Sequence, residues 1–533
     1  MDGEGATIES AWVPLSHSVF RTLWIASLVS NIGTWMQNVG AAWAMTSLSP
    51  SPLMVALVQS ATSVPVFIVG LPAGAIADIV DRRRLLLFTQ MWMLVAAALL
   101  AGLAFVNLMT PTTLLGLTFA LGVGAAMNAP TWQAITAELV PRSELTRAVA
   151  LNALPVNIGR AIGPALGGIL VAAAGPGFVF ALNAVSFVAV LVAVFLWRRD
   201  APRAQLPAER VIGGTVAGIR YARYAPPLAA VLVRTGVFIV CASAFWALLP
   251  LIARRELGLD ALGYGLLLAC FGFGAVVGAA FLPRVKRWLA ADALIALATV
   301  LFALVSALTA LWRFVPGVAI AMTLGGVAWI AMMASLNGAA QTAVPAWVRA
   351  RALGMYLLVF QGGLGLGSAL WGVVAQHVGV SIALASSAVG AVLGLAAILR
   401  WPLRAIPTLD VTPSPHWPEP HLDIVPAPDE GPVRVDVEYR VDPAQSDAFV
   451  NAIRDLEVIR RRDGAVSWAV FEDPRQQGRY VETFIVESWV EHLRQHERVT
   501  VDDRTLQDRI RVFHIADTPP VVTHLIAAKS RRL

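Results

Sequence analysis

Up to residue 404 the chain alternates between long apolar runs and short polar segments. Each run reaches about 20 residues, the length that a helix needs to cross the hydrocarbon core of a bilayer. Twelve runs predict spanning helices, at residues 18–44, 53–78, 85–106, 112–137, 146–174, 178–197, 226–253, 261–283, 289–311, 315–344, 349–377 and 380–402. The pattern therefore predicts an all-α polytopic membrane protein with 12 transmembrane helices.

The pattern changes after residue 404. Residues 405–432 are rich in proline and predict an extended linker. Shorter runs follow in residues 433–533, and they predict strands at Val433–Val441, Ala465–Glu472, Tyr480–Glu487 and Val521–Ala527 and helices at Pro443–Arg462 and Trp489–Val512. The order β-α-β-β-α-β is that of a ferredoxin-like fold. We expect a soluble C-terminal α+β ferredoxin-like domain, with helices on one face of its sheet and an apolar opposite face that pairs with a second copy.

Composition agrees with this division. Hydrophobic residues make up 57% of the 533 residues and charged residues 14%, whereas soluble proteins carry about 25% charged residues. Residues 430–533 hold 18 acidic and 16 basic residues, which leaves 16 acidic and 24 basic residues for the rest. The basic excess lies in short loops near 81–84, 141–147, 198–223, 284–287 and 349–351, where it sets topology and does not indicate nucleic-acid binding. The charge pattern places both termini in the cytoplasm, although Arg254, Arg255 and Arg313 depart from it.

The two sets of runs repeat each other. A shift of 204 residues superimposes special residues without a gap, among them Gly70 on Gly274, Gly74 on Gly278, Arg83 on Arg287, Pro141 on Pro345, Gly159 on Gly363 and Gly163 on Gly367. We therefore expect two six-helix repeats, 18–197 and 226–404, joined by a cytoplasmic linker at 198–225 and preceded by a cytoplasmic N-terminus at 1–17. In such a layout the substrate site lies near the midplane between the repeats.

The loop after the second run carries a distinctive set of residues: Gly74, Asp78, Arg82, Arg83 and Arg84. By themselves they indicate a helix end, a turn and a topology signal. They resemble the signature loop of the major facilitator superfamily. That resemblance implies a gating loop whose charges latch the cytoplasmic helix ends in one state of the transporter.

A second motif lies in the run 146–174, where Gly159, Gly163 and Gly167 share one helix face and Pro164 and Gly168 complete a GP-x-x-GG core. It resembles the antiporter signature of the same superfamily, which is associated with exporters. A general small-residue packing face is the alternative. The resemblance implies that this helix packs on 261–283 through Gly274 and Gly278. It also implies that the run 53–78 packs on 349–377 through Gly363 and Gly367.

Polar residues inside the apolar runs are the candidates for a substrate cavity: Asn31, Asn38, Gln133, Asn157, Arg160, Arg234, Asn337 and Gln361. Intramembrane arginines mark functional sites by default, but Arg160 and Arg234 also fit a structural role as partners of helix carbonyls. Trp35, Trp43, Trp246 and Trp329 either line the cavity or form interfacial belts. No acidic residue is placed deep in a run, so a coupling proton follows only from the family analogy.

The whole chain resembles the transmembrane secretion effector branch of the superfamily, which includes the enterobactin exporters. The resemblance implies a secondary active transporter of the bacterial inner membrane. Such a protein contacts lipid and exports siderophore-like or drug-like molecules by alternating access, with a proton as the coupling ion.

The C-terminal domain resembles the antibiotic-biosynthesis monooxygenase fold, a dimeric α+β barrel, through its element order and the run Glu487–His496. The resemblance implies a homodimer through this domain. An oxygenase-like enzyme or a ligand-binding regulatory domain is the alternative to a tail without chemistry, and Trp468, Trp489 and His492 are the candidate pocket residues. His492 and His496 could share a helix face for a metal, but solvated histidines are the more common case. We predict no cofactor and no metal.

Overall fold

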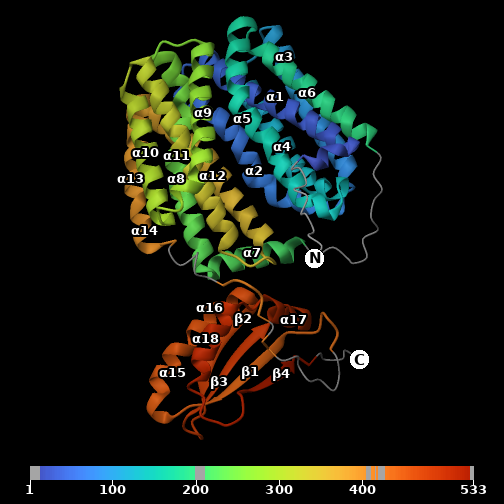
Figure 1. Cartoon of the computed structure of the whole chain (residues 1–533), viewed down its shortest axis with the longest axis vertical. Helices are drawn as coiled ribbons and strands as arrows, with labels where there is room; N and C mark the ends of the chain where they lie inside the picture. The colour runs from blue at the N-terminus through green and yellow to red at the C-terminus, as the bar shows by residue number, and fades with distance from the viewer. Residues whose placement is uncertain (1–11, 198–210, 404–409, 415, 418–425, 529–533) are drawn as a thin grey trace, which may run out of the picture. The chain divides into compact units, whose positions relative to one another are not determined.

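The computed structural model describes residues 12–197, 211–403, 410–414, 416–417 and 426–528. They form two compact units (Figure 1), of which the first comprises Met1–Ala208, Arg234–Leu336 and Leu357–Ile398 and the second Glu209–Val233, Asn337–Tyr356 and Leu399–Leu533. The predicted segments 1–17, 198–225 and 405–432 lie partly outside the described residues. The second unit thus joins the C-terminal domain with the end of the predicted 198–225 linker and with residues of the second repeat.

The first half contains six long helices: α1 Ser18–Leu48, α2 Pro52–Ile79, α3 Arg82–Phe105, α4 Pro111–Leu139, α5 Leu145–Ala174 and α6 Pro176–Leu196. Proline begins three of them, since its missing N–H would have no partner in the first turn. The side chains of Ser51 and Thr110 cap two of these ends, and Gly175, at φ 79°, separates α5 from α6. Helix α1 packs along α5 and α6, α2 along α4, and α3 along α6.

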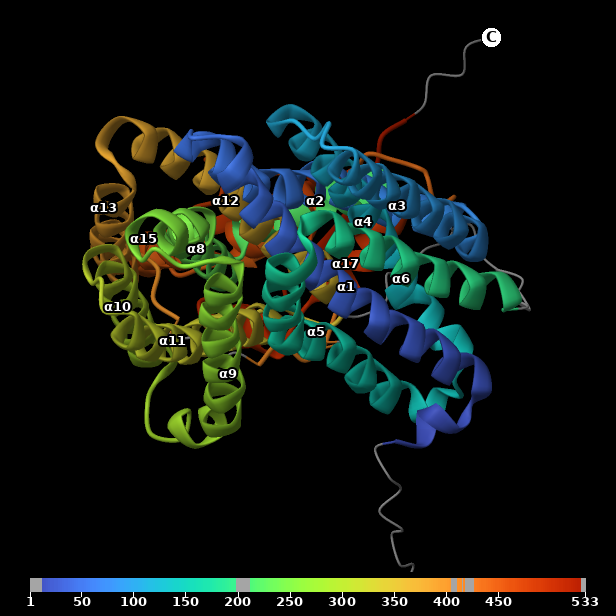
Figure 2. The same cartoon turned by 90° about the horizontal axis from the view of Figure 1, so that it is seen from above.

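The second half follows α7 (Val211–Tyr224) and repeats the arrangement with α8 Pro226–Leu251, α9 Ala261–Val285, α10 Ala291–Leu311, α11 Val315–Thr342, α12 Arg349–Val378 and α13 Val380–Leu393. A π-helical turn, Ile252–Glu256, extends α8, and the short helix α14 (Ala397–Arg400) follows α13. Helix α5 contacts both α1 of its own half and α9 of the other half, as the two views show (Figures 1 and 2).

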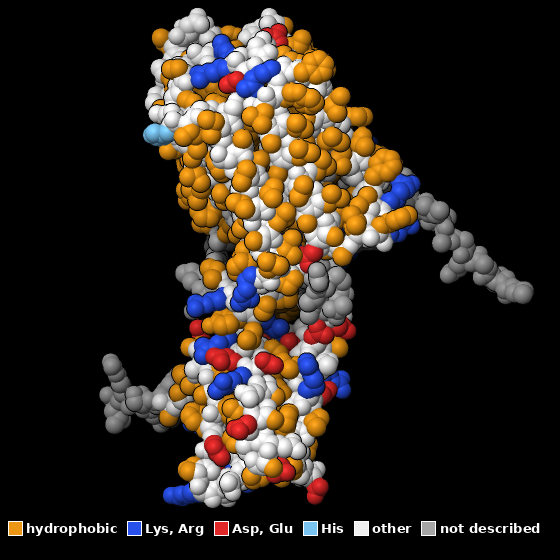
Figure 3. All heavy atoms as spheres, turned by 90° about the vertical axis from the view of Figure 1, so that its left-hand side faces the viewer, with side chains coloured by type: hydrophobic (Ala, Val, Ile, Leu, Met, Phe, Trp, Pro, Cys, Tyr) orange, Lys and Arg blue, Asp and Glu red, His pale blue; other side chains and the backbone are white. Residues whose placement is uncertain are grey.

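Among the described residues, eleven helices are long and apolar enough to cross a membrane. Helix α1 is the one predicted span outside this set, although its 31 residues are long enough. Large apolar side chains point outward from the helices, for example Phe195 at 66% and Leu311 at 70% exposure. Hydrophobic side chains are spread over the helical part of the face shown in Figure 3, where charged side chains are few between the helix ends. An apolar surface of this extent fits lipid as the surrounding medium.

The C-terminal domain has the predicted element order. Strands β1 Val433–Arg440, β2 Ala465–Glu472, β3 Arg479–Val486 and β4 Val521–Ile526 form an antiparallel sheet in the order β2-β3-β1-β4. Each predicted helix is divided, into α15 Ser446–Ile453 and α16 Asp455–Asp463, and into α17 Trp489–Arg498 and α18 Val501–Arg511. The second division arises because Thr500 forms a capping box with Asp503. Alternate residues of β1 and β3 face a core that includes Phe449, Phe484 and Ile510.

Candidate functional site

The basic residues after α2 bind helix ends of their own half. The Asp81 carboxylate caps α3 by accepting the Arg84 N–H at 2.9 Å. Arg82 donates to the Glu138 carboxylate of α4 at 2.7 Å. Arg83 donates to the last carbonyls of α6, with 2.5 Å to the Phe195 oxygen. The loop therefore ties the ends of α3, α4 and α6 together.

The other members of the predicted gating loop take less part in these contacts. The Arg84 side chain is exposed. Asp78 lies in the last turn of α2, and its side chain is outside the described residues. A Cβ built on Gly74 would meet nothing within 4 Å, so no close helix approach requires glycine there. A latch formed by Asp78 remains a prediction.

The glycine face of α5 packs inside its own half. A Cβ built on Gly159 would lie 2.9 Å from the Asn31 backbone, and one built on Gly163 would lie 2.5 Å from Cβ of Trp35. Gly167 likewise faces Met36. The expectation that this face packs on α9 is wrong for these residues, because the side of α5 that carries them lies against α1.

The glycines of the second half show the same outcome. Gly274 and Gly278 face Thr323 and Val327 of α11, not α5. Gly363 and Gly367 face α8 through Ile239, Val240 and Ser243, not α2. The residues are close-packing glycines as expected, but the predicted partners are wrong, because both faces lie inside the second half.

Other glycines form the seams between the two halves. Gly168 of α5, the last of the predicted motif, meets Gly265 of α9, with 2.8 Å from either built Cβ to the other residue's Cα. On the opposite seam, Gly362, Gly365 and Gly372 of α12 meet Phe67, Val64 and Ala56 of α2. The helix pairs α5–α9 and α2–α12 are the predicted pairs, although they pack through different faces.

The predicted cavity residues divide into groups. Arg160 lies with its guanidinium carbon 5.4 Å from the Trp35 ring centroid, and Asn31 packs against the neighbouring Gly159. These three side chains come together where α1 and α5 meet, and the Arg160 backbone also approaches Gly272 of α9. The described residues give Arg160 no ion pair. The structure therefore brings Asn31, Trp35 and Arg160 to one place at the edge of the second half.

The remaining polar candidates are more scattered. Asn38, Gln133 and Asn157 are exposed, and Asn157 donates to the Ala153 carbonyl of its own helix. Gln361 is half-buried. Asn337, also half-buried, belongs to the second unit, where it accepts from Gln341 at 2.6 Å. Their common site thus remains a prediction.

Arg234 has the structural role that sequence reasoning left open. Its guanidinium donates to the Asp292 carboxylate in the first turn of α10, and the two residues are 5% and 6% exposed. Its assignment to a substrate cavity is not supported, because a buried pair neutralises the charge. Sequence reasoning missed the pair since Asp292 lies near a helix end. The available signal was an arginine in one apolar run and an aspartate at the start of another.

Arg254 and Arg255, which depart from the charge pattern, cross from the second half to the first. Arg254 donates to the Thr46 hydroxyl at 2.8 Å and to Ser47, and its guanidinium carbon lies 5.4 Å from the Trp43 ring centroid. Arg255 donates to the Pro50 carbonyl at 2.8 Å. These contacts join the halves at the helix ends opposite the 81–84 loop. Sequence reasoning missed them because polar acceptors in an uncharged loop give no signal.

The predicted aromatic residues pack mainly with one another. Trp43 stacks on Tyr264 at 5.8 Å between ring centroids. Trp246 and Trp329 meet at 5.2 Å inside a cluster with Phe271. Trp35 is the candidate that contacts a predicted polar residue, Arg160.

The interior of the C-terminal domain holds an unusual polar cluster. The Arg460 guanidinium forms a buried pair with Glu482 at 2.9 Å, and Trp468 donates to the same carboxylate at 3.0 Å. Trp417, from the linker, lies over Arg460 at 4.8 Å and donates to Gln507 at 2.9 Å. The linker is held here because Ser414 donates from its N–H to the Val499 carbonyl.

Several buried atoms of this cluster have no hydrogen-bond partner among the described residues: Arg460 Nη1, His492 Nδ1, both amide atoms of Gln495, and Gln507 Nε2. Leaving a buried polar atom unpaired costs about 1–3 kcal/mol, so these atoms lack partners that a bound water or a ligand with polar atoms would supply. Burial and the neighbouring His524 and His496 lower the pKa of His492 to about 3. His492 is buried and His496 partly buried, burial also lowers the pKa of His496, to about 4, and solvated histidines are therefore the wrong interpretation. No group of described residues has the arrangement of a metal site.

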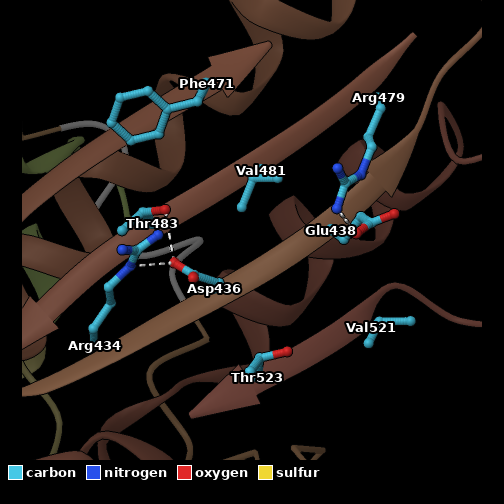
Figure 4. Close-up of a pocket in the computed structure, with 9 residues that line it drawn as sticks. All are labelled: Arg434, Asp436, Glu438, Phe471, Arg479, Val481, Thr483, Val521 and Thr523. Atoms are coloured by element: carbon cyan, nitrogen blue, oxygen red, sulfur yellow. Dashed lines mark hydrogen bonds and ion pairs between the residues drawn. The ribbon is translucent and has the colours of Figure 1, made fainter. Parts of the chain in front are cut away.

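The open face of the sheet differs from the expected apolar face. Phe471, Val481 and Val521 lie on it beside two ion pairs, Arg434–Asp436 at 2.9 Å and Arg479–Glu438 at 2.7 Å (Figure 4). The mixture arises because the outward residues of β1 are charged, whereas the flanking strands contribute Arg479 and two threonines beside their apolar residues. The physical reason given for dimerisation is therefore incomplete.

Comparison with known proteins identifies the group. The sequence pattern of the transmembrane secretion effector family matches residues 9–532. The chain belongs to this family. The match covers both six-helix halves and the C-terminal domain, and it confirms the resemblance to major facilitator transporters. Nothing in it concerns the monooxygenase-like fold, which stays a prediction.

Individual relatives of this secretion effector are distant. The Staphyloferrin A transporter of Staphylococcus aureus is 24% identical over 272 residues, which are 50% of this chain and 66% of that protein. The enterobactin exporter EntS of Salmonella typhi is 28% identical over 50% of this chain and 63% of its own. The chain thus spans slightly less than two thirds of these relatives. A solved POT family transporter in complex with a thioalcohol conjugated peptide superimposes with a TM-score of 0.60, 14% identity, 72% of this chain and 95% of its own, which shows the fold alone. The secretion effector is a multi-pass protein of the inner membrane.

Proposed function

We propose that this secretion effector is a secondary active transporter that exports small organic molecules, siderophore-like or drug-like, across the bacterial inner membrane. Family membership over both halves carries the proposal. The siderophores in the names of the relatives define the first compounds to test.

Inside-out vesicles containing the protein should accumulate one or more compounds of a panel of siderophores, antibiotics and dyes. Vesicles with the Gly168→Leu variant are the matched control, since Gly168 lies on a seam and carries no polar group. Accumulation equal to that of empty vesicles for every compound would contradict transport of these classes.

Alternating access is the mechanism that the contacts favour. Arg254 and Arg255 join the halves at one end. If both termini are cytoplasmic, as the basic loops predict, these arginines close the outer side. They must release Thr46, Ser47 and Pro50 when the site opens outward. A Ser47→Cys/Arg254→Cys pair in a background lacking Cys241 and Cys270 should be joined by a short bifunctional methanethiosulfonate reagent, which replaces the length of the arginine side chain, and the cross-link should stop transport until a reductant cleaves it. Full transport by the cross-linked protein would refute this outer closure.

Substrate preference follows from Arg160. A cation without an ion pair at membrane depth favours anionic or electron-rich ligands and penalises lipophilic cations, and proton coupling would supply the energy. Arg160→Gln should lower export of acidic or catechol-like compounds, whereas Arg160→Lys should retain much of it. Equal wild-type export of cationic dyes and anions would contradict the preference.

A second candidate function concerns the tail. The unpaired atoms around Arg460 and Gln495 support a small-molecule site, in which the ligand is either sensed or oxidised. Titration of the full-length protein with 2,3-dihydroxybenzoate should give binding heat that Gln495→Leu reduces, and oxygen consumption would distinguish catalysis from sensing. A homodimer through the open sheet face is part of this proposal. Sedimentation of the purified protein as a monomer would contradict that dimer.

A further inference from the structure

The second unit contains contacts between the C-terminal domain and two segments that precede it in the chain, α7 and the α11–α12 connection. Tyr221 of α7 is 2% exposed, and the Arg462 guanidinium carbon lies 5.6 Å from its ring centroid. Trp347 lies between α11 and α12, and the Arg498 guanidinium carbon lies 4.7 Å from its ring centroid. Tyr221 and Trp347 also meet edge to face at 5.6 Å. Two arginines of the domain therefore contact two aromatic rings that touch each other.

Both arginines are positioned by carboxylates of their own domain. Arg462 donates to Asp463 at 2.8 Å and to Asp503 at 2.6 Å. Arg498 donates to Glu491 at 2.9 Å and to the Asp463 carbonyl at 2.7 Å. Because these bonds fix the guanidinium planes before any ring arrives, little side-chain entropy is lost on contact. The four residues Tyr221, Trp347, Arg462 and Arg498 are called the aromatic clamp below.

A third segment approaches the clamp at Gly464. Its φ of +136° is accessible to glycine, and a built Cβ would lie 3.4 Å from Arg498 Nη1 and 3.5 Å from Nη2 of Arg220 in α7. These are ordinary van der Waals distances, so the backbone conformation and not a lack of space favours glycine at this position.

We propose that the aromatic clamp docks the C-terminal domain on α7 and on the α11–α12 connection, and that docking is thermodynamically linked to the state of the transporter. Helix α7 lies in the connection between the halves, one residue before α8, and Trp347 lies within the second half. A movement that separates Tyr221 from Trp347 would break the clamp. Linkage is reciprocal, so releasing the domain changes the balance between transporter states by the same factor. This second statement rests on the proposed alternating access, whereas docking does not.

Docking is tested by the accessibility of Tyr221 in the full-length protein. Hydroxyl-radical labelling, read by mass spectrometry, should modify Tyr221 slowly in the wild type. Trp347→Leu removes the ring beneath Arg498, and a desolvated cation–π contact corresponds to roughly a tenfold or larger change in equilibrium. Labelling of Tyr221 should therefore rise about tenfold. Trp288→Leu, at an 86% exposed tryptophan, is the matched control and should leave the rate unchanged.

Trp347→Leu also removes the edge-to-face contact with Tyr221, so Arg498→Met, which leaves both rings in place, is the variant that isolates the arginine contact. It should also raise Tyr221 labelling, and the double variant Trp347→Leu/Arg498→Met should add little to Trp347→Leu, because the Arg498–Trp347 contact is absent from both. Tyr221 labelling within twofold of the wild type in Trp347→Leu would overturn docking, whether or not Arg498→Met folds. For linkage, Trp347→Leu should change the rate of the Ser47–Arg254 cysteine cross-link several-fold. An unchanged cross-link rate alongside faster Tyr221 labelling would overturn linkage and leave docking in place.

Discussion

Replacing Asp292 by asparagine should destabilise the second half strongly. The change keeps the size of the side chain but leaves the Arg234 guanidinium, 5% exposed, without its carboxylate. Breaking a buried pair by removing one partner costs about 3–5 kcal/mol, because an uncompensated charge stays buried. At about 2–4 °C per kcal/mol for a unit of this size, the midpoint of thermal unfolding should fall by roughly 6–20 °C.

Thermal unfolding of the purified protein in detergent, followed by far-UV circular dichroism, measures this fall. Glu256→Gln is the matched control. In the wild type, Glu256 forms an ion pair with Arg313 at 2.7 Å, but the side chains of Glu256 and Arg313 are 33% and 42% exposed. An exposed pair contributes about 0–1 kcal/mol. The double variant Arg234→Met/Asp292→Leu should regain most of the lost stability, since an apolar replacement of a buried pair is often neutral. If Asp292→Asn unfolds at the same temperature as Glu256→Gln, the pair is not a buried structural pair.

Three further predictions follow from contacts described above. Gly168→Leu should lower transport at normal expression, because a side chain there would meet Gly265 across the seam. Gly163→Leu should instead destabilise the first half by about 1–3 kcal/mol, because its side chain would overpack against α1. Equal thermal stability of the two variants would refute this distinction. Arg82→Gln should lower the unfolding temperature by a few degrees, because the 2.7 Å bond to Glu138 is lost. An unchanged unfolding temperature would contradict this prediction and would indicate that water replaces the bond. Burial lowers the pKa of His492 to about 3, so only the unfolded state takes up a proton at this residue as pH falls below about 6.5. The free energy of unfolding of the C-terminal domain should therefore fall by about 2 kcal/mol by about pH 5. His492→Phe should reduce this dependence of stability on pH, and an unchanged dependence would contradict neutral burial.

The sequence predicted the bounds of the helices better than it predicted which helices pack against one another. Run length and apolar composition set each span, so the bounds of α5 and α9 differ from expectation by at most two residues. Spacing also placed Gly159 and Gly163 on one face correctly. It did not tell which neighbour that face meets, because α1 and α9 both lie beside α5 and both accept small residues. The partner depends on helix rotation, which is set by all the contacts of the half together.

Charged residues were hardest to interpret one at a time. Asp292 looked peripheral because it begins a helix, yet it is buried by the residues around Arg234. His492 and His496 looked solvated because α17 is highly charged, yet the linker residue Trp417 packs on His496, with 5.0 Å between ring centroids. Burial of this kind depends on segments far apart in the chain, and one-dimensional patterns do not contain it.

The attachment of the linker to the C-terminal domain shortens the tether that holds this domain. The chain is bonded to α18 from Asp410 onward, through the Asp410 and Thr412 carbonyls, so only a few residues separate that point from Leu403. At about 3.3–3.6 Å per residue, such a tether spans roughly 25 Å at most. A domain confined within this radius experiences a millimolar effective concentration of its docking partner. A clamp far too weak to join separate molecules would therefore keep the domain bound for most of the time, while still letting a ligand or a change of transporter state release it.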